Sequence, residues 1–69
     1  MTSSRRFDEL QQRYRAAWDA HQVIADFNAQ LLQAGKQPSN EQLIIEERTA
    51  EAVLIARDEL LAALTDLQS

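Results

Sequence analysis

The chain contains no cysteine, which excludes disulfide bonds and thiolate metal sites. It has one glycine, too few for the glycine-rich loops that bind phosphate groups. Serines are few outside the chain ends and the central break, and no base is placed to activate one as a nucleophile. We therefore expect a protein that is not an enzyme and that uses no cofactor.

Long apolar runs are also missing. The longest are residues 52–56 and 60–64, far shorter than the roughly 20 residues that a membrane-spanning helix needs. The basic residues near the N-terminus are followed by Asp8, Glu9 and Gln11 rather than by an apolar stretch, unlike a secretory signal. The sequence predicts a cytoplasmic protein that does not enter a membrane.

The chain is short, and its charge is unevenly distributed. A domain of 69 residues without disulfides or metal usually needs a partner chain to enclose enough apolar surface. The net charge of -4 disfavours general attraction to nucleic acid. One basic cluster nevertheless precedes an acidic remainder, and it consists of Arg5, Arg6, Arg13 and Arg15.

The only strong break in the chain lies near its middle. Gly35 is expected to end a first helix in the left-handed conformation, and Ser39 with Gln42 has the spacing of a capping box for a second helix. Pro38 and Leu43 have the spacing of a hydrophobic staple. We predict a single all-α domain over 1–69, with a helix over about 4–34, a turn over 35–39 and a helix over about 40–67, folded into an antiparallel two-helix hairpin.

Each predicted helix has mostly apolar residues at alternating steps of three and four, the spacing of a heptad seam. In the first helix the seam is Phe7, Leu10, Tyr14, Ala17, His21, Ile24, Asn28 and Leu31. In the second it is Leu43, Glu46, Ala50, Val53, Arg57, Leu60, Leu64 and Leu67. Folding about Gln37 pairs His21 with Val53 and Asn28 with Glu46. The second pair can satisfy two polar groups in an apolar seam and so set the register.

Both predicted helices have further apolar residues beside the seam, and a lone hairpin cannot cover them. A second copy could, because two hairpins would form a four-helix bundle with a larger core. We therefore expect a homodimer. The sequence leaves open whether His21 and Asn28 face the other helix or the other subunit.

His21 is the only histidine, but the pattern favours an interior or interface residue over a catalytic one. Metal binding in a helical bundle would need inward carboxylates and a Glu-x-x-His pair, which the chain lacks. We predict no metal site.

Four residues are predicted to form protein interfaces. Trp18 and Phe27 lie on the broad apolar side of the first helix, which favours packing in the core or against a second copy. Ile44 and Ile55 are eleven residues apart, so they share one line of the second helix among charged residues. Extended by Ala62, this line is a candidate contact strip for another protein or for a higher oligomer.

The sequence thus favours a small interaction or regulatory protein that acts as a homodimeric helical bundle and binds another protein. The alternative is a helical-hairpin dimer that binds RNA or DNA through Arg5, Arg6, Arg13 and Arg15. Against this alternative, these arginines can instead form solvated ion pairs with Asp58, Glu59 and Asp66.

Overall fold

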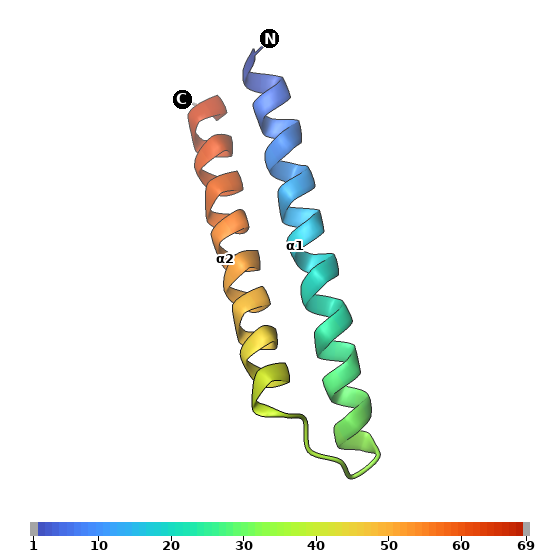
Figure 1. Ribbon diagram of the computed structural model, residues 1–69. Helices are drawn as coiled ribbons and strands as arrows, with labels where there is room; N and C mark the ends of the chain where they lie inside the picture. Colours follow the sequence, from blue (N-terminus) through green and yellow to red (C-terminus); the bar gives the residue numbers. More distant parts are fainter. Residues whose placement is uncertain (1, 69) are drawn as a thin grey trace.

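The computed structural model describes the backbone of residues 2–68 and the side chains of residues 5–67. It contains two helices, α1 (Thr2–Gln33) and α2 (Asn40–Gln68), and no strand in the described part of the chain. The helices run antiparallel side by side, so α1 begins and α2 ends at the same end of the molecule (Figure 1), which we call the open end. The hairpin predicted from the sequence is confirmed.

The hairpin is long and narrow, with extents of 51 × 16 × 13 Å. Its helices begin and end within two residues of the expected bounds, since α1 covers 2–33 and α2 covers 40–68. Neither helix, within residues 2–68, combines enough length and apolar character to cross a bilayer.

α1 ends in a Schellman motif, which the single glycine makes possible. Gly35 has a φ of 75°, a left-handed conformation that a residue with a Cβ adopts at a cost. The Lys36 N–H donates to the Leu31 carbonyl at 2.8 Å, and the Gly35 N–H donates to the Leu32 carbonyl at 3.0 Å. These two bonds satisfy carbonyls that the end of the helix would otherwise leave without partners.

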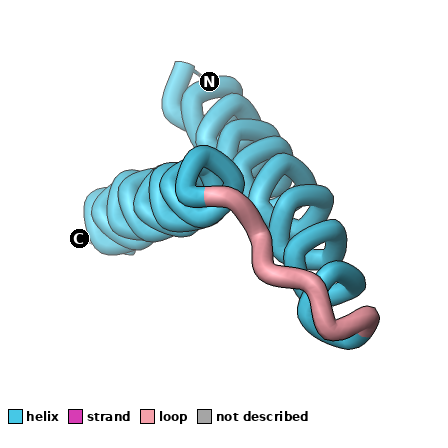
Figure 2. The backbone as a smooth tube through the Cα atoms, turned by 60° about the horizontal axis from the view of Figure 1, so that its bottom comes forward, coloured by secondary structure: helices cyan, strands magenta, loops and turns pink. Residues whose placement is uncertain are grey.

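α2 begins in the predicted capping box. The Ser39 N–H donates to Gln42 Oε1 at 2.8 Å, and the Gln42 N–H donates to Ser39 Oγ at 3.2 Å. Between the two caps the chain crosses from α1 to α2 in a short loop (Figure 2), in which Pro38 is buried. Each helix therefore has its own local stop or start signal at the turn.

The seam of α1 is the predicted one. All eight predicted positions are buried or half-buried, and the neighbouring positions are exposed except for Ala25. Leu10 is 6 % exposed and forms the apolar core together with Val53 and Ala56 of α2. The three-four spacing of this helix thus identified the face that packs on α2.

The seam of α2 is rotated from the predicted one. Leu43, Arg57 and Leu67, which were expected in the seam, are exposed, so that part of the prediction is wrong. Ala56 is buried instead, one residue from Arg57. Burying a guanidinium without a partner is costly, whereas alanine lets the two helices approach closely.

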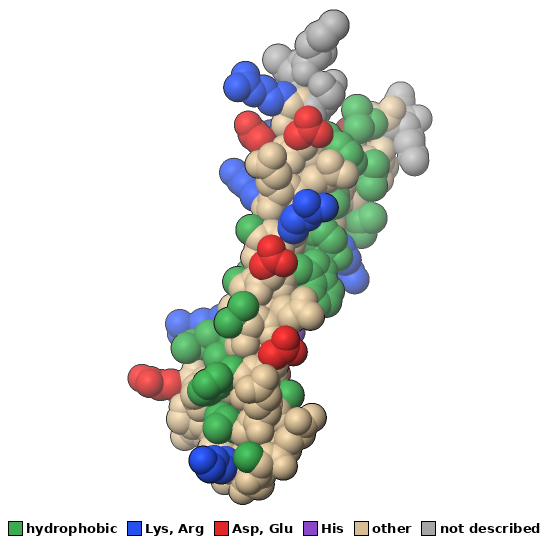
Figure 3. All heavy atoms as spheres, turned by 90° about the vertical axis from the view of Figure 1, so that its right-hand side faces the viewer, with side chains coloured by type: hydrophobic (Ala, Val, Ile, Leu, Met, Phe, Trp, Pro, Cys, Tyr) green, Lys and Arg blue, Asp and Glu red, His purple; other side chains and the backbone are tan. Residues whose placement is uncertain are grey.

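The hairpin leaves much apolar surface uncovered, and Figure 3 shows apolar side chains on the surface along its length. Eleven large apolar residues are between 44 and 73 % exposed. They are Trp18, Val23, Phe27, Leu32, Leu43, Ile44, Ile45, Leu54, Ile55, Leu61 and Leu67. Two helices alone therefore enclose only a thin core.

Candidate interaction surfaces

The seam near the turn is held together by polar contacts. Asn28 is 2 % exposed, and its Nδ2 donates to Glu46 Oε1 at 2.7 Å and to the Gln42 carbonyl at 3.3 Å. The predicted contact between Asn28 and Glu46 is confirmed, and Asn28 faces the other helix of the same chain. Its Oδ1 is buried and has no hydrogen-bond partner within the described residues.

His21 also faces α2, one turn closer to the open end than Ile24. Its Nδ1 lies 3.0 Å from the hydroxyl of Thr49, and that hydroxyl donates to the Glu46 carbonyl at 2.9 Å. A threonine hydroxyl has one hydrogen, so Nδ1 must supply the proton for the first bond. The partner of His21 is thus Thr49, one turn from the predicted Val53.

These bonds join the two helices in one polar layer, which we define as His21, Asn28, Glu46 and Thr49. Trp18 adds an edge contact, with its ring centroid 6.0 Å from that of His21. The side-chain hydrogen bonds from His21 to Thr49 and from Asn28 to Glu46 both link α1 to α2, which fits a role in setting the register. The layer thus joins the two helices of the hairpin through directional contacts.

The two flanks of the seam form two faces of the hairpin. The first, which we call the isoleucine face, is identified by an ion pair between Arg13 and Glu59 at 3.9 Å. Residues seven apart share a side of a helix, so Arg13 lies with Ala20 and Phe27, and Glu59 lies with Ile45 and Ala52. We define the isoleucine face as Ala20, Val23, Phe27, Ile45, Ala52, Ile55 and Ala62.

The opposite flank is the more apolar one. On α2 it follows the spacing 43, 47, 50, 54, 57, 61 and 64, which we call the leucine stripe. On α1 it contains Trp18, Ala25 and Leu32, again seven residues apart. We define the leucine face as the leucine stripe together with these three residues of α1.

Each face has a surface hollow toward the open end. The hollow on the leucine face has a volume of about 620 Å³ and is lined by Trp18, Tyr14 and Leu60 with polar residues of α1 around them. The hollow on the other side has a volume of about 340 Å³ and lies beside the small side chains of Ala62 and Ala63. Both are open depressions between the helices rather than enclosed cavities.

The structure divides the four predicted interface residues between surfaces. Trp18 lies on the leucine face, Phe27 and Ile55 on the isoleucine face, and Ile44 on the outer side of α2, adjacent to Ile55 along the helix line. All four are 44 % or more exposed. One partner surface cannot cover all of them, because the two faces point in opposite directions.

Leu54 and Leu61 are interface candidates that the sequence prediction did not single out. They are 50 and 51 % exposed, and both belong to the leucine stripe. The signal was present, since the stripe repeats at steps of four and three. It was missed because α2 is apolar on several adjacent sides, and the predicted seam used part of the same stripe.

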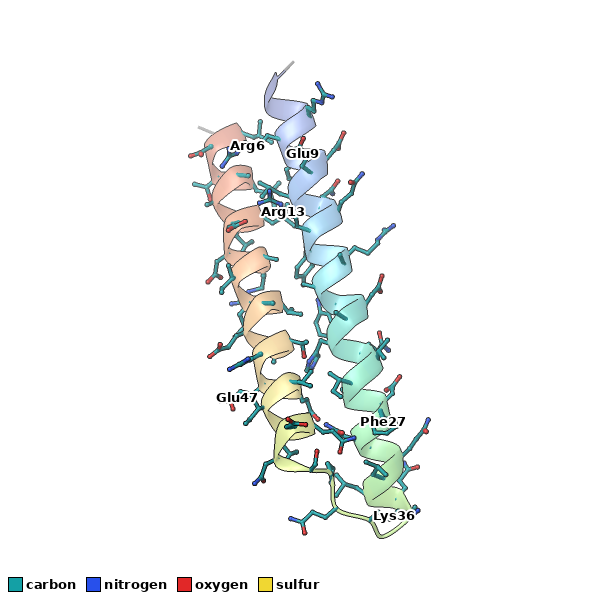
Figure 4. The ribbon with its side chains drawn as sticks, in the orientation of Figure 1. Arg6, Glu9, Arg13, Phe27, Lys36 and Glu47 are labelled. Atoms are coloured by element: carbon teal, nitrogen blue, oxygen red, sulfur yellow. The ribbon has the colours of Figure 1, made fainter. Side chains whose placement is uncertain are left out.

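The four arginines of the alternative prediction do not form one patch. Arg6 and Arg13 lie on the side of α1 toward α2 (Figure 4), while the spacing places Arg5 and Arg15 on other sides of the helix. Arg13 pairs with Glu59, and Arg6 lines the same hollow as Glu59 and Asp66. The two arginines that share a side of α1, Arg6 and Arg13, therefore both lie near acidic residues of α2.

Within residues 2–68 no three His, Asp or Glu side chains are grouped so as to hold a metal ion. The chain matches no protein-family model, no curated protein and no solved structure. The two apolar faces are therefore the features from which a function can be argued.

Proposed function

We propose that this protein is a non-enzymatic interaction protein that works as a homodimeric four-helix bundle. One face of each hairpin would pack against the second copy, and the other would bind another protein. The main support is the amount of surface that one chain exposes.

The isolated hairpin exposes 5640 Å². A folded monomer of 7.9 kDa is expected to expose about 4,400 Å². The excess of about 1,200 Å² is larger than the roughly 800 Å² that each partner contributes to a standard interface. Pairing through one face would therefore bring the exposed area into the range of a compact domain.

The leucine face suits the second copy better than the isoleucine face does. Of the seven positions of the leucine stripe, only Glu47 and Arg57 are charged. The corresponding line on the isoleucine side, which runs 45, 48, 52, 55, 59, 62 and 66, has charged residues at 48, 59 and 66. Cores of homodimer interfaces are depleted of charge, and this favours the leucine face.

The isoleucine face would then stay accessible for another protein. Phe27 of α1 lies across the seam from Ile45 of α2, with Val23 and Ile55 further toward the open end, and all four are exposed. A partner helix with its own apolar stripe could lie along this line, in the helix-in-groove mode. Arg48 and Glu59 at its border would contribute to selectivity more than to affinity.

Sedimentation equilibrium over a range of about 1 to 100 µM tests the homodimer, at concentrations where moderate affinities are visible. The expected mass is twice 7.9 kDa. Leu54→Glu with Leu61→Glu should give monomers, while Val23→Glu with Ile55→Glu, a matched change on the isoleucine face, should leave the dimer intact. A monomeric wild-type chain with a cooperative melt would contradict the proposal.

Binding of RNA or DNA remains the alternative, with less support because the arginines are spread around α1. It would require affinity for an oligonucleotide that falls steeply with salt, since released counterions determine the slope. Arg13→Glu with Arg15→Glu should then abolish binding. If the wild-type chain has no such salt-dependent affinity, this alternative is excluded.

A further inference from the structure

We infer that the two copies pack with α2 against α2 of the second copy, antiparallel, with the turns at opposite ends and Leu54 near the two-fold axis. This inference rests on the proposed homodimer and specifies its geometry. It follows from the spacing of the leucine stripe and from the distribution of charge along the hairpin.

The leucine stripe is nearly symmetric about Leu54. Steps of three, four and three lead from Leu54 to 57, 61 and 64, and steps of four, three and four lead back to 50, 47 and 43, so matching positions on the two sides are equally far from Leu54 to within one residue. A reversed second copy therefore places Leu54 opposite Leu54 and Leu43 opposite Leu64. Such self-complementarity is what an isologous interface requires.

The two charged residues of the stripe fit the same arrangement. In the reversed copy Arg57 faces Ala50, a small residue one turn from Glu47. The guanidinium of Arg57 can then reach the carboxylate of Glu47 across the interface, and symmetry gives two such pairs, one on each side of Leu54. Within its own chain the guanidinium of Arg57 lies 3.5 Å from the carboxylate of Asp58, and both side chains are more than half exposed.

The charge of the whole hairpin favours turns at opposite ends. The half nearer the turn, residues 18–53, has two basic and six acidic side chains, a net charge of -4. The half nearer the open end has five of each over residues 5–17 and 54–67, a net charge of zero. A dimer with both turns at one end would place the two acidic halves together, whereas the opposite arrangement places each beside a neutral half.

The arrangement also places Trp18 close to the axis. Contacts across the seam join His21 to Thr49, Arg13 to Glu59 and Asn28 to Glu46, so Trp18 lies level with Leu54. The solvent exposure of Trp18, the only tryptophan of the chain, should thus decrease on dimerisation. Its fluorescence emission should shift to shorter wavelength as protein concentration rises, in step with the mass.

The absence of cysteine allows a direct test by cross-linking. Leu54→Cys, oxidised under mild conditions, should form a covalent dimer, because a disulfide needs Cα atoms about 4.4 to 6.8 Å apart. Ile55→Cys, the neighbouring residue on the other face, should stay uncross-linked. An equal mixture of Leu43→Cys and Leu64→Cys chains should give the mixed covalent dimer in excess over either symmetric one.

Charge reversal provides an independent measurement. Glu47→Arg alone and Arg57→Glu alone should each weaken dimerisation by about 2- to 30-fold, as expected for losing two exposed ion pairs. The double variant should restore the wild-type affinity. Glu51→Arg, on the outer side of α2, is the control and should leave the affinity unchanged.

The outcomes separate the inference from the proposed function. A wild-type chain that stays monomeric contradicts the homodimer and the inference together. A wild-type dimer whose Leu54→Cys variant is folded by circular dichroism but does not cross-link contradicts only the inferred geometry. Failure of the double charge reversal to restore affinity contradicts the geometry in the same way.

Discussion

The two halves of the seam differ in how they join the helices. Farther from the turn than Thr49 the contact is apolar, with Leu10, Val53 and Ala56 as its buried residues. Toward the turn it is polar, with His21 bonded to Thr49 and Asn28 bonded to Glu46. Apolar contacts supply free energy but tolerate sliding, whereas directional hydrogen bonds fit only one register. The comparison indicates that the open half supplies most of the stability and the turn half specifies the alignment.

Leu10→Ala should give the largest loss of stability, because it removes a buried side chain from the apolar half. Truncating a buried leucine costs about 2 to 5 kcal/mol, a large share of what so small a domain has. Denaturant melts at fixed protein concentration would measure it. Val23→Ala, on the same helix but 73 % exposed, is the control and should change stability by less than about 0.5 kcal/mol.

Glu46→Ala should have the next largest effect, since it leaves Asn28 buried with the Gln42 carbonyl as its remaining partner. An unsatisfied buried polar group costs about 1 to 3 kcal/mol. Glu46→Gln keeps an acceptor and should lose less. If the alanine variant melts like the wild type, the polar layer does not contribute as described.

Replacing Asn28 and Glu46 together by leucine distinguishes stability from alignment. We expect a chain at least as stable as the wild type, because the desolvation of both polar groups is avoided. The double variant should however populate more than one register, and spin labels at Arg15 and Arg57 would then report a broad range of distances. If the wild type and the double variant both give a single narrow distance, the polar layer does not set the alignment of the helices.

Thr49→Val should give a smaller loss, about 0.5 to 1.5 kcal/mol, because it removes the acceptor that His21 uses while keeping the shape of the side chain. Thr49→Ser retains the hydroxyl and is the control. Thermal melts of both variants, compared at one concentration, check the difference. An equal effect of the two changes would point to lost packing instead of a lost hydrogen bond.

Arg13→Ala should have the smallest effect. The ion pair with Glu59 is 3.9 Å long, and its side chains are 69 and 48 % exposed, so water and salt screen it. We expect a change within about 0.5 kcal/mol that disappears at high salt. A loss comparable to that of Leu10→Ala would contradict the division into two halves.

The sequence predicted the hairpin well where local signals decide the structure. The caps at Gly35 and Ser39, the seam of α1 and the pair Asn28 and Glu46 all follow from spacing and residue type. The seam of α2 did not, because that helix is apolar on adjacent sides and periodicity alone cannot choose between them. The choice depends on which of the adjacent residues Ala56 and Arg57 is buried against α1, and that is a property of both helices together.

The candidate surfaces were harder to predict for the same reason. Trp18, Phe27, Ile44 and Ile55 are exposed as expected for interface residues, but their division between faces depends on which side of α1 lies against α2. That orientation is visible only once Arg13 and Glu59 are seen together. Their role in binding stays a prediction.

The turn has a practical consequence for engineering. Because the Schellman motif, which includes the Lys36 N–H, ends α1 and the capping box begins α2 independently, the exposed residue Gln37 between them is not needed to define either helix. A foreign peptide spliced in at this point should be displayed at the tip of the rod, since lengthening a closed loop adds only about 0.6 kcal/mol per doubling. The protein could thereby serve as a small carrier that presents an epitope about 50 Å from the open end of the hairpin.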